Sequence, residues 1–292
     1  MIKWINDFFD ITNDISVPIL ISLIVFIVGG LTSTCFKWIV KRANEIRSRK
    51  MLLALIDEVV KDLNNKETNT EKFYQEIRTD YNGNWSLSHK PISYLETFFE
   101  LDFIQVYSSF ANKKNMTQRV FTTSDKSFHE AWEALRGLRF IEDRLENDLN
   151  KMMEGFNKFH KEYRIGLDRY YKYYDESSIS MNGVKKTAEN EEDIDYLIKQ
   201  DNIWRDWQKL DPDSRTAYHI TYNEIILRMM DLNREYPNSK FAQKSDHDIL
   251  HCLHQFEEIK NVLMVYRAKF KGFHEQYQKS KNILETFSAN MK

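Results

Sequence analysis

The chain has 292 residues, of which 42 are basic and 44 acidic, so its formal net charge is −2 with neutral histidines. This balance argues against nucleic acid as a partner, since nucleic-acid-binding surfaces need an excess of positive charge. Two cysteines exclude a disulfide framework, and only eight glycines and four prolines disfavour sheet-and-turn folds and glycine-rich phosphate loops. The composition predicts an all-α protein, and we expect no cofactor.

The most distinctive segment is an uncharged run from Ile15 to Phe36, in which 13 of 22 residues are Ile, Leu, Val or Phe. About 20 apolar residues suffice for a helix to cross a bilayer. No small-residue cleavage site follows the run, so we expect it to be retained as an anchor. We therefore predict a short extracytoplasmic tail over residues 1–14 and a single transmembrane helix over residues 15–40.

The flanking charges predict the orientation of this anchor. Three aspartates precede the run, whereas six cations follow it closely: Lys37, Lys41, Arg42, Arg47, Arg49 and Lys50. Positively charged flanks stay on the cytoplasmic side of a membrane. We therefore predict an outer N-terminus and a cytoplasmic C-terminal region, with the lipid bilayer as the first partner.

Three small residues, Ser22, Gly29 and Ser33, share one narrow face of the predicted anchor. Small side chains let transmembrane helices approach closely, so this face is a candidate oligomerisation surface and the chain a candidate homo-oligomer. The alternative is that serine and glycine are merely tolerated in a single span.

Residues 41–122 are predicted to form membrane-proximal helices. An apolar stripe favours continuation of the anchor helix through residues 43–64, and we expect this helix to end in the polar stretch 64–70. A second helix is expected near residues 71–79, and a strongly apolar third one over residues 92–111.

Residues 123–292 are predicted to form a long-helix bundle. Between Phe128 and Tyr174, fourteen apolar residues recur at steps of three or four, with a mean step of about 3.5, as in coiled coils. This pattern predicts one helix of roughly 50 residues, about 75 Å long. A similar stripe predicts a final long helix over residues 245–287.

Two shorter helices are expected between these long ones, over residues 191–210 and 212–236, the second with Pro212 in its first turn and its end at Pro237. The two long helices carry matching apolar stripes and should pack against each other. The predicted fold is thus an N-terminal transmembrane helix followed by an elongated, largely antiparallel cytoplasmic bundle with two coiled-coil-like helices.

Histidine placement is the least ordinary polar feature of the bundle. His247, His251, His254 and Glu258 share one face of the final predicted helix. Imidazoles one turn apart can bind a divalent ion such as zinc, which makes these residues candidate metal ligands. One helix supplies few aligned donors, however, and the four side chains can equally face water, so our prediction is that no metal is bound.

A second pattern, Arg267 followed seven residues later by His274, resembles the loose signature of the HEPN ribonuclease superfamily, whose domains are also helical bundles. The resemblance implies that Arg267 stabilises a phosphate and that His274 acts as an acid or base. About one such match is expected by chance in a chain of this composition. We therefore assign no catalytic residue and keep a membrane-tethered HEPN-like ribonuclease as an alternative function.

Residues 164–174 interleave basic and tyrosine side chains, as a single-strand nucleic-acid binder does. Half of the tyrosines belong to the apolar stripe of the long helix. We interpret the segment as a packed helix end whose basic side chains are solvated.

The N-terminal region resembles the start of many bacterial single-pass proteins, some of them grouped as phage abortive-infection or CRISPR-accessory membrane effectors. The resemblance lies in the order of a short outer tail, one transmembrane span, a group of basic residues and the segment Arg49–Glu58. The resemblance implies a location in the bacterial inner membrane. It further implies an oligomeric effector or scaffold of antiviral defence rather than an enzyme. A third possibility is an adaptor that recruits a cytoplasmic protein partner to the membrane.

Overall fold

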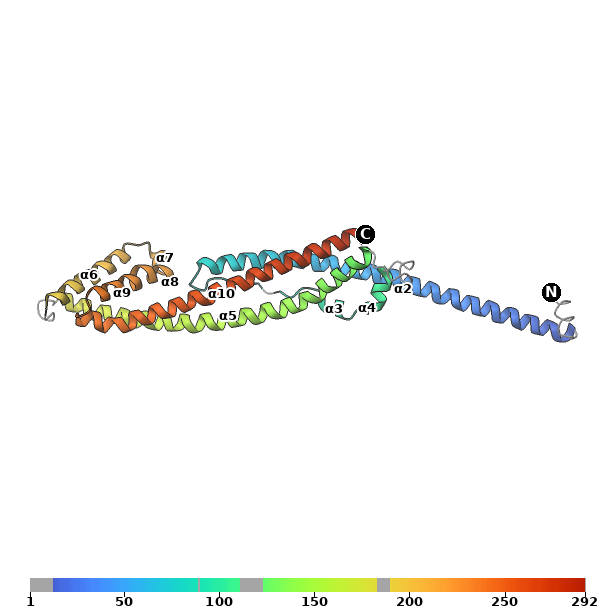
Figure 1. Cartoon of the computed structure of the whole chain (residues 1–292), viewed down its shortest axis with the longest axis horizontal. Coiled ribbons are helices and arrows are strands. Elements are labelled where there is room, and N and C mark those ends of the chain that lie inside the picture. The colour runs from blue at the N-terminus through green and yellow to red at the C-terminus, as the bar shows by residue number, and fades with distance from the viewer. Residues whose placement is uncertain (1–12, 89, 111–122, 183–189, 292) are drawn as a thin grey trace. The chain divides into compact units, whose positions relative to one another are not determined.

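The computed structural model describes residues 13–88, 90–110, 123–182 and 190–291, and in these ranges every regular element is a helix (Figure 1). Three helices are long: α2 (Asn13–Thr79), α5 (Thr123–Asn182) and α10 (Lys240–Met291). The predicted all-α fold with long helices is therefore confirmed. The predicted tail lies largely outside the described residues, as do residues 111–122 of the predicted membrane-proximal region.

The shorter elements are α3 (Leu95–Phe99), α4 (Phe103–Phe110), α6 (Glu191–Gln208), α7 (Pro212–Arg215), α8 (Tyr218–Thr221), the π-helical turn η2 (Tyr222–Leu227) and α9 (Arg228–Glu235). The prediction of one helix over residues 212–236 was thus too simple. Its start is confirmed, because Pro212 lies in the first turn of α7 and the Asp211 side chain accepts hydrogen bonds from two backbone N–H groups there. The chain then leaves helical geometry before α8.

The chain forms two compact units, each built from segments distant in sequence. Unit 1 consists of Met1–Val60, Ser93–Ala134 and Ile283–Lys292, and unit 2 of Lys61–Ile92 and Leu135–Asn282. The three long helices contribute residues to both units.

Unit 1 has an apolar core to which α2, α4, α5 and α10 contribute side chains. Leu52, Ile56 and Val59 of α2 are essentially inaccessible to solvent, as predicted from the helical spacing of the apolar stripe. The rings of Phe110, Phe128 and Phe287 pack together at centroid distances of 5.4–6.2 Å. Ser288 Oγ donates a hydrogen bond of 2.9 Å to Asp57. Residues from both ends of the chain therefore hold this core together.

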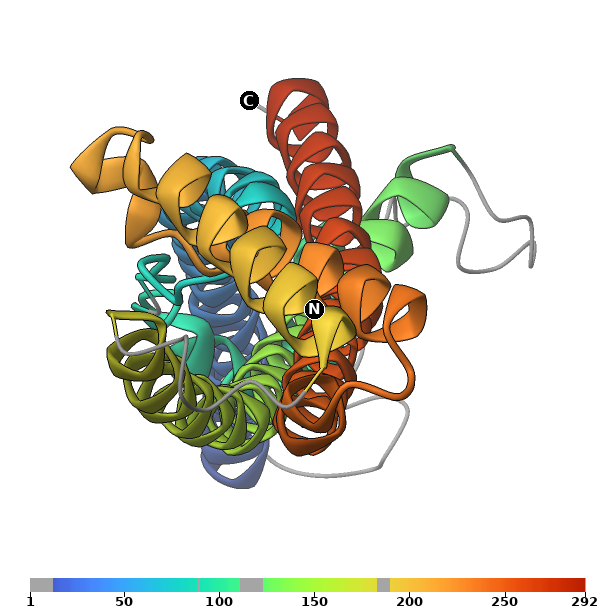
Figure 2. The same ribbon diagram turned by 90° about the vertical axis from the view of Figure 1, so that its left-hand side faces the viewer.

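In unit 2, α5 and α10 run antiparallel, as expected from their matching stripes. Asp148 pairs with Lys269, the Tyr163 ring contacts Phe256, and the Tyr173 hydroxyl donates to the Phe241 carbonyl, so residue numbers rise along α5 as they fall along α10. Figure 2 shows α6 and α9 beside this pair. Trp204 of α6 stacks on Tyr174 of α5, and the Tyr196 hydroxyl of α6 forms hydrogen bonds with Asn233 of α9 and Ser245 of α10.

Two predicted boundaries were wrong. Helix α2 does not end in the polar stretch 64–70, because Lys66 and Glu67 form ion pairs with Glu142 of α5 and Lys281 of α10. The expected helix 92–111 is divided into α3 and α4, because the Asp102 side chain accepts hydrogen bonds from the backbone N–H groups of Ile104 and Gln105 and so begins a new helix.

Candidate functional site

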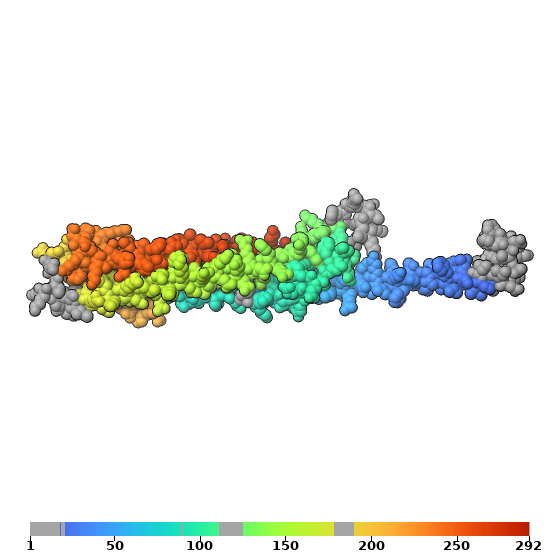
Figure 3. Space-filling view, turned by 90° about the horizontal axis from the view of Figure 1, so that it is seen from below, coloured from blue at the N-terminus to red at the C-terminus, as the bar shows by residue number. Residues whose placement is uncertain are grey.

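The apolar part of α2 is the most unusual surface of the described chain. Every residue from Ile21 to Asn44 is exposed, and Phe26 is 79% exposed. By length and composition α2 is able to cross a membrane: its most apolar 18-residue window has a mean hydropathy of 1.9, and none of that window is buried. Figure 3 shows this stretch of α2 as a rod that no described segment covers. A helix that is apolar all round needs an apolar environment.

The predicted oligomerisation face lies on this exposed stretch. Ser22, Gly29 and Ser33 are all exposed, and a Cβ atom built on Gly29 or on the neighbouring Gly30 meets no atom within 4 Å. The Thr32 hydroxyl donates to the Val28 carbonyl of the same helix at 2.8 Å. Among the described residues, none covers this face.

The candidate metal ligands on α10 differ in their exposure. His247 and His254 are exposed, whereas His251 is half-buried, with its Nε2 atom 3.2 Å from the Glu162 carbonyl oxygen of α5. Glu258 lies on the same helix and is half-buried. Among the described residues, no three His, Cys, Asp or Glu side chains are grouped so as to hold a metal ion.

Arg267 and His274 have different surroundings. The Nδ1 atom of His274 lies 3.2 Å from the Glu67 carbonyl oxygen, and its ring packs edge-on against Tyr74. Arg267 lines a separate pocket with Arg78 and Tyr81. The two residues lie two turns apart on α10, about 10 Å along the axis.

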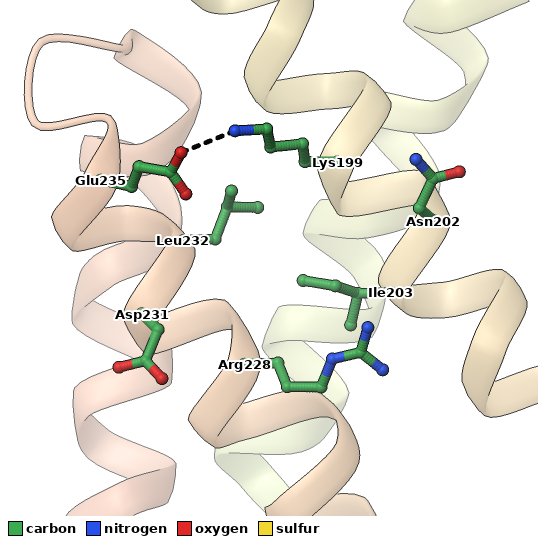
Figure 4. Close-up of a pocket in the computed structure, with 7 residues that line it drawn as sticks. All are labelled: Lys199, Asn202, Ile203, Arg228, Asp231, Leu232 and Glu235. Carbon is green, nitrogen blue, oxygen red and sulfur yellow. Dashed lines mark hydrogen bonds and ion pairs between the residues drawn. The ribbon is translucent and has the colours of Figure 1, made fainter.

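A groove between α6 and α9 contains two cations, Lys199 and Arg228 (Figure 4). The Lys199 ammonium lies 2.6 Å from Glu235, and the Arg228 guanidinium lies 3.0 Å from Asp206. Both cations are therefore neutralised within the chain. The groove offers little attraction to an anionic ligand.

Unit 2 contains a buried charged network that sequence reasoning missed. The Lys66 ammonium lies 2.5 Å from the Glu142 carboxylate, with side-chain exposures of 7% and 11%, and the Tyr277 hydroxyl donates to the same carboxylate. Burial, then the adjacent Glu142 charge, raises the pKa of Tyr277. The only sequence signal was a lysine at an apolar stripe position of α2. The charged and polar groups of this network are paired with one another, which indicates a structural role.

Cys252 is likewise a packing residue. Burial raises the pKa of its thiol to about 12, so it is protonated at neutral pH and is a poor nucleophile. Its sulfur faces Gly166 of α5. In the tyrosine-rich segment, Tyr170 of the predicted stripe is buried, Tyr174 of that stripe is half-buried, and Tyr173, outside the stripe, is also buried.

The described chain thus offers an exposed apolar helix and a packed helical bundle. Comparison of the chain with protein-family models, with curated proteins and with solved structures finds no match.

Proposed function

We propose that the chain is a single-pass protein of the bacterial inner membrane, in which the apolar stretch of α2 crosses the bilayer and the bundle lies in the cytoplasm. The observation that carries this proposal is the complete exposure of residues 21–44 within a helix that continues into a packed core. In water such a helix is costly, whereas in a bilayer its backbone hydrogen bonds are satisfied internally and its side chains match the solvent. The cations from Lys37 to Lys50 support the cytoplasmic placement of the bundle.

Within this topology we propose an oligomeric effector or scaffold rather than an enzyme. The open face of Ser22, Gly29 and Ser33 supports association of the anchors, because a single span gains dispersion contacts only from another helix in the membrane. The resemblance of the N-terminal segment to abortive-infection and CRISPR-accessory effectors supports a role in antiviral defence. The HEPN-like and adaptor alternatives are each less supported, since no described feature favours either.

The topology is tested with reporters fused after Lys292 in a bacterial host. A reporter that is active only after export should stay inactive, and a reporter that is active only in the cytoplasm should work in the membrane fraction. Activity of the exported reporter would overturn the orientation.

The defence role is tested by phage challenge of cells that carry the gene. Cells with the wild-type chain should yield fewer plaques than cells without it, and Gly29→Ile should reduce protection. Equal plaque counts over a broad phage panel would leave the scaffold without the proposed biological role.

A further inference from the structure

A groove of about 710 Å³ lies in unit 1 where the apolar stretch of α2 ends. One wall is formed by α2 and the other by the start of α4. We call it the α2–α4 groove. Its apolar lining includes Phe36, Val40 and Ile104, and its charged lining consists of Lys37, Lys41, Glu45 and Asp102.

The second wall is firmly attached to α2. Gln105 Nε2 donates to Ser48 Oγ at 3.1 Å, and the Arg49 guanidinium lies over the Phe110 ring at 5.3 Å. Val106 and Phe110 bury the opposite face of α4 in the core. Ile104 is left 76% exposed beside Phe36, which is 68% exposed. The groove therefore has an unburied apolar lining that the core does not use.

Charges follow a definite order along the groove. Lys37 and Lys41 come first, one turn apart, at the end of the apolar stretch, and neither forms an ion pair with a described residue. Glu45 lies one turn further from the apolar end and pairs with Arg42 at 3.2 Å. Asp102 caps α4 with one carboxylate oxygen and remains exposed. The lining carries two lysines and two carboxylates, so its formal charges balance.

We propose that the α2–α4 groove binds the headgroup of a phospholipid that carries a primary amine, namely phosphatidylethanolamine. An acyl chain lies along Phe36, Val40 and Ile104, the phosphate lies at Lys37 and Lys41, and the ammonium group points toward Asp102. The assignment rests on the proposed function, because the span must bring Phe36 to the membrane surface.

Charge complementarity selects this headgroup over other phospholipids. An anionic headgroup meets the same lysines but brings no cation to the Asp102 carboxylate, which repels it. A choline headgroup has the right net charge but no N–H group to donate to a carboxylate. Only a zwitterion with a primary amine satisfies both ends of the groove.

The test uses the full-length chain, purified in detergent and stripped of lipid, and native mass spectrometry with added short-chain lipids. Phosphatidylethanolamine should bind about tenfold more tightly than phosphatidylcholine or phosphatidylglycerol, the ratio expected from one added charge-assisted hydrogen bond. Equal binding of the three lipids, or preference for phosphatidylglycerol, would overturn the assignment.

Two variants test the proposed contacts of the ammonium group and of the phosphate separately. Asp102→Asn removes the charge while keeping a good helix cap, so it should abolish the preference for the amine over choline. Lys37→Gln with Lys41→Gln should weaken binding of all three lipids. Lys50→Gln, which lies outside the groove, is the matched control and should change neither. An unchanged amine preference in Asp102→Asn would contradict the assignment.

The same samples distinguish failure of this inference from failure of the proposed function. Every variant keeps at least four of the six cations and should remain in the membrane fraction. A chain that stays in the membrane without lipid preference refutes the groove assignment alone. A wild-type chain that is absent from the membrane fraction refutes the proposed function as well.

Discussion

At the scale of single residues, Gly166 sets how closely α5 and α10 approach. A Cβ atom at this position would lie 2.7 Å from Cys252 Sγ and 2.9 Å from His251 Cδ2. Alanine gains about 1 kcal/mol of helix propensity but must push two packed side chains aside, at a cost of about 1–3 kcal/mol. Gly166→Ala should therefore lower the free energy of unfolding by roughly 1 kcal/mol, measured by chemical denaturation.

The matched control is Gly272→Ala in α10, where an added Cβ meets nothing within 4 Å. This variant should be as stable as the wild type or gain up to about 1 kcal/mol. Destabilisation of both variants to the same extent would show that the close approach at Gly166 has no special cost.

His160 makes the stability of unit 2 depend on pH. Its ring stacks on Phe156 and lies edge-on to Tyr218, and burial, then the charge of Arg164, lowers its pKa. The fold thus favours the neutral imidazole of His160. The contribution of His160 to the free energy of unfolding is therefore complete above the pKa of the unfolded state, about 6.5, and is lost as the pH falls through the lower pKa of the folded state.

His160→Phe should therefore reduce the loss of unfolding free energy between about pH 7.5 and pH 5.5. Denaturation curves at several pH values provide the measurement. An identical pH dependence in the wild type and the variant would rule out this contribution.

At the scale of elements, the buried pair of Lys66 and Glu142 joins α2 to α5. Lys66→Met leaves a buried carboxylate without its cation and should destabilise unit 2 by about 3–5 kcal/mol. Adding Glu142→Gln should restore much of this loss, because the amide carbonyl still accepts from Tyr277. Lys72→Met breaks only the exposed pair with Glu76, so this control should cost less than about 1 kcal/mol. Equal effects of Lys66→Met and Lys72→Met would contradict the argument.

The sequence predicts some features of these helices and not others. The apolar stripes of α2, α5 and α10 were predictable because burial follows the helical period, and Leu52, Tyr163 and Phe256 lie in the core. The continuity of α2 through residues 64–70 was not predictable, because it depends on ion-pair partners more than 70 residues away in sequence. Local polarity predicted a break, and tertiary ion pairs prevent it.

Candidate sites were less predictable than the helices. The exposed apolar stretch follows from composition alone, whereas the α2–α4 groove depends on where α4 begins. Asp102 is an ordinary aspartate in the sequence, and only the structure shows that it caps α4 and lines the same groove as Lys41. His251, unlike His247 and His254, is half-buried and contacts α5, which the sequence does not predict either.

At the scale of the whole molecule, the proposed oligomer depends on one face of the anchor. Gly29→Ile should weaken association by about 1–2 kcal/mol per contact, because it separates helices at their closest approach. Gly30→Ile makes the same chemical change about 100° around the helix and should leave association intact. Sedimentation of the full-length chain in detergent measures both. A monomeric wild type, or equal behaviour of the two variants, would contradict the proposed face.

The central claim is that α2 anchors the chain in a bilayer, and extraction of isolated membranes with alkaline carbonate tests it most directly. The wild-type chain should stay in the membrane pellet. A variant with arginine at Val25 and Val28 should be released, since each central arginine costs about 2.5–3.5 kcal/mol of insertion free energy. Release of the wild-type chain into the supernatant would contradict the account.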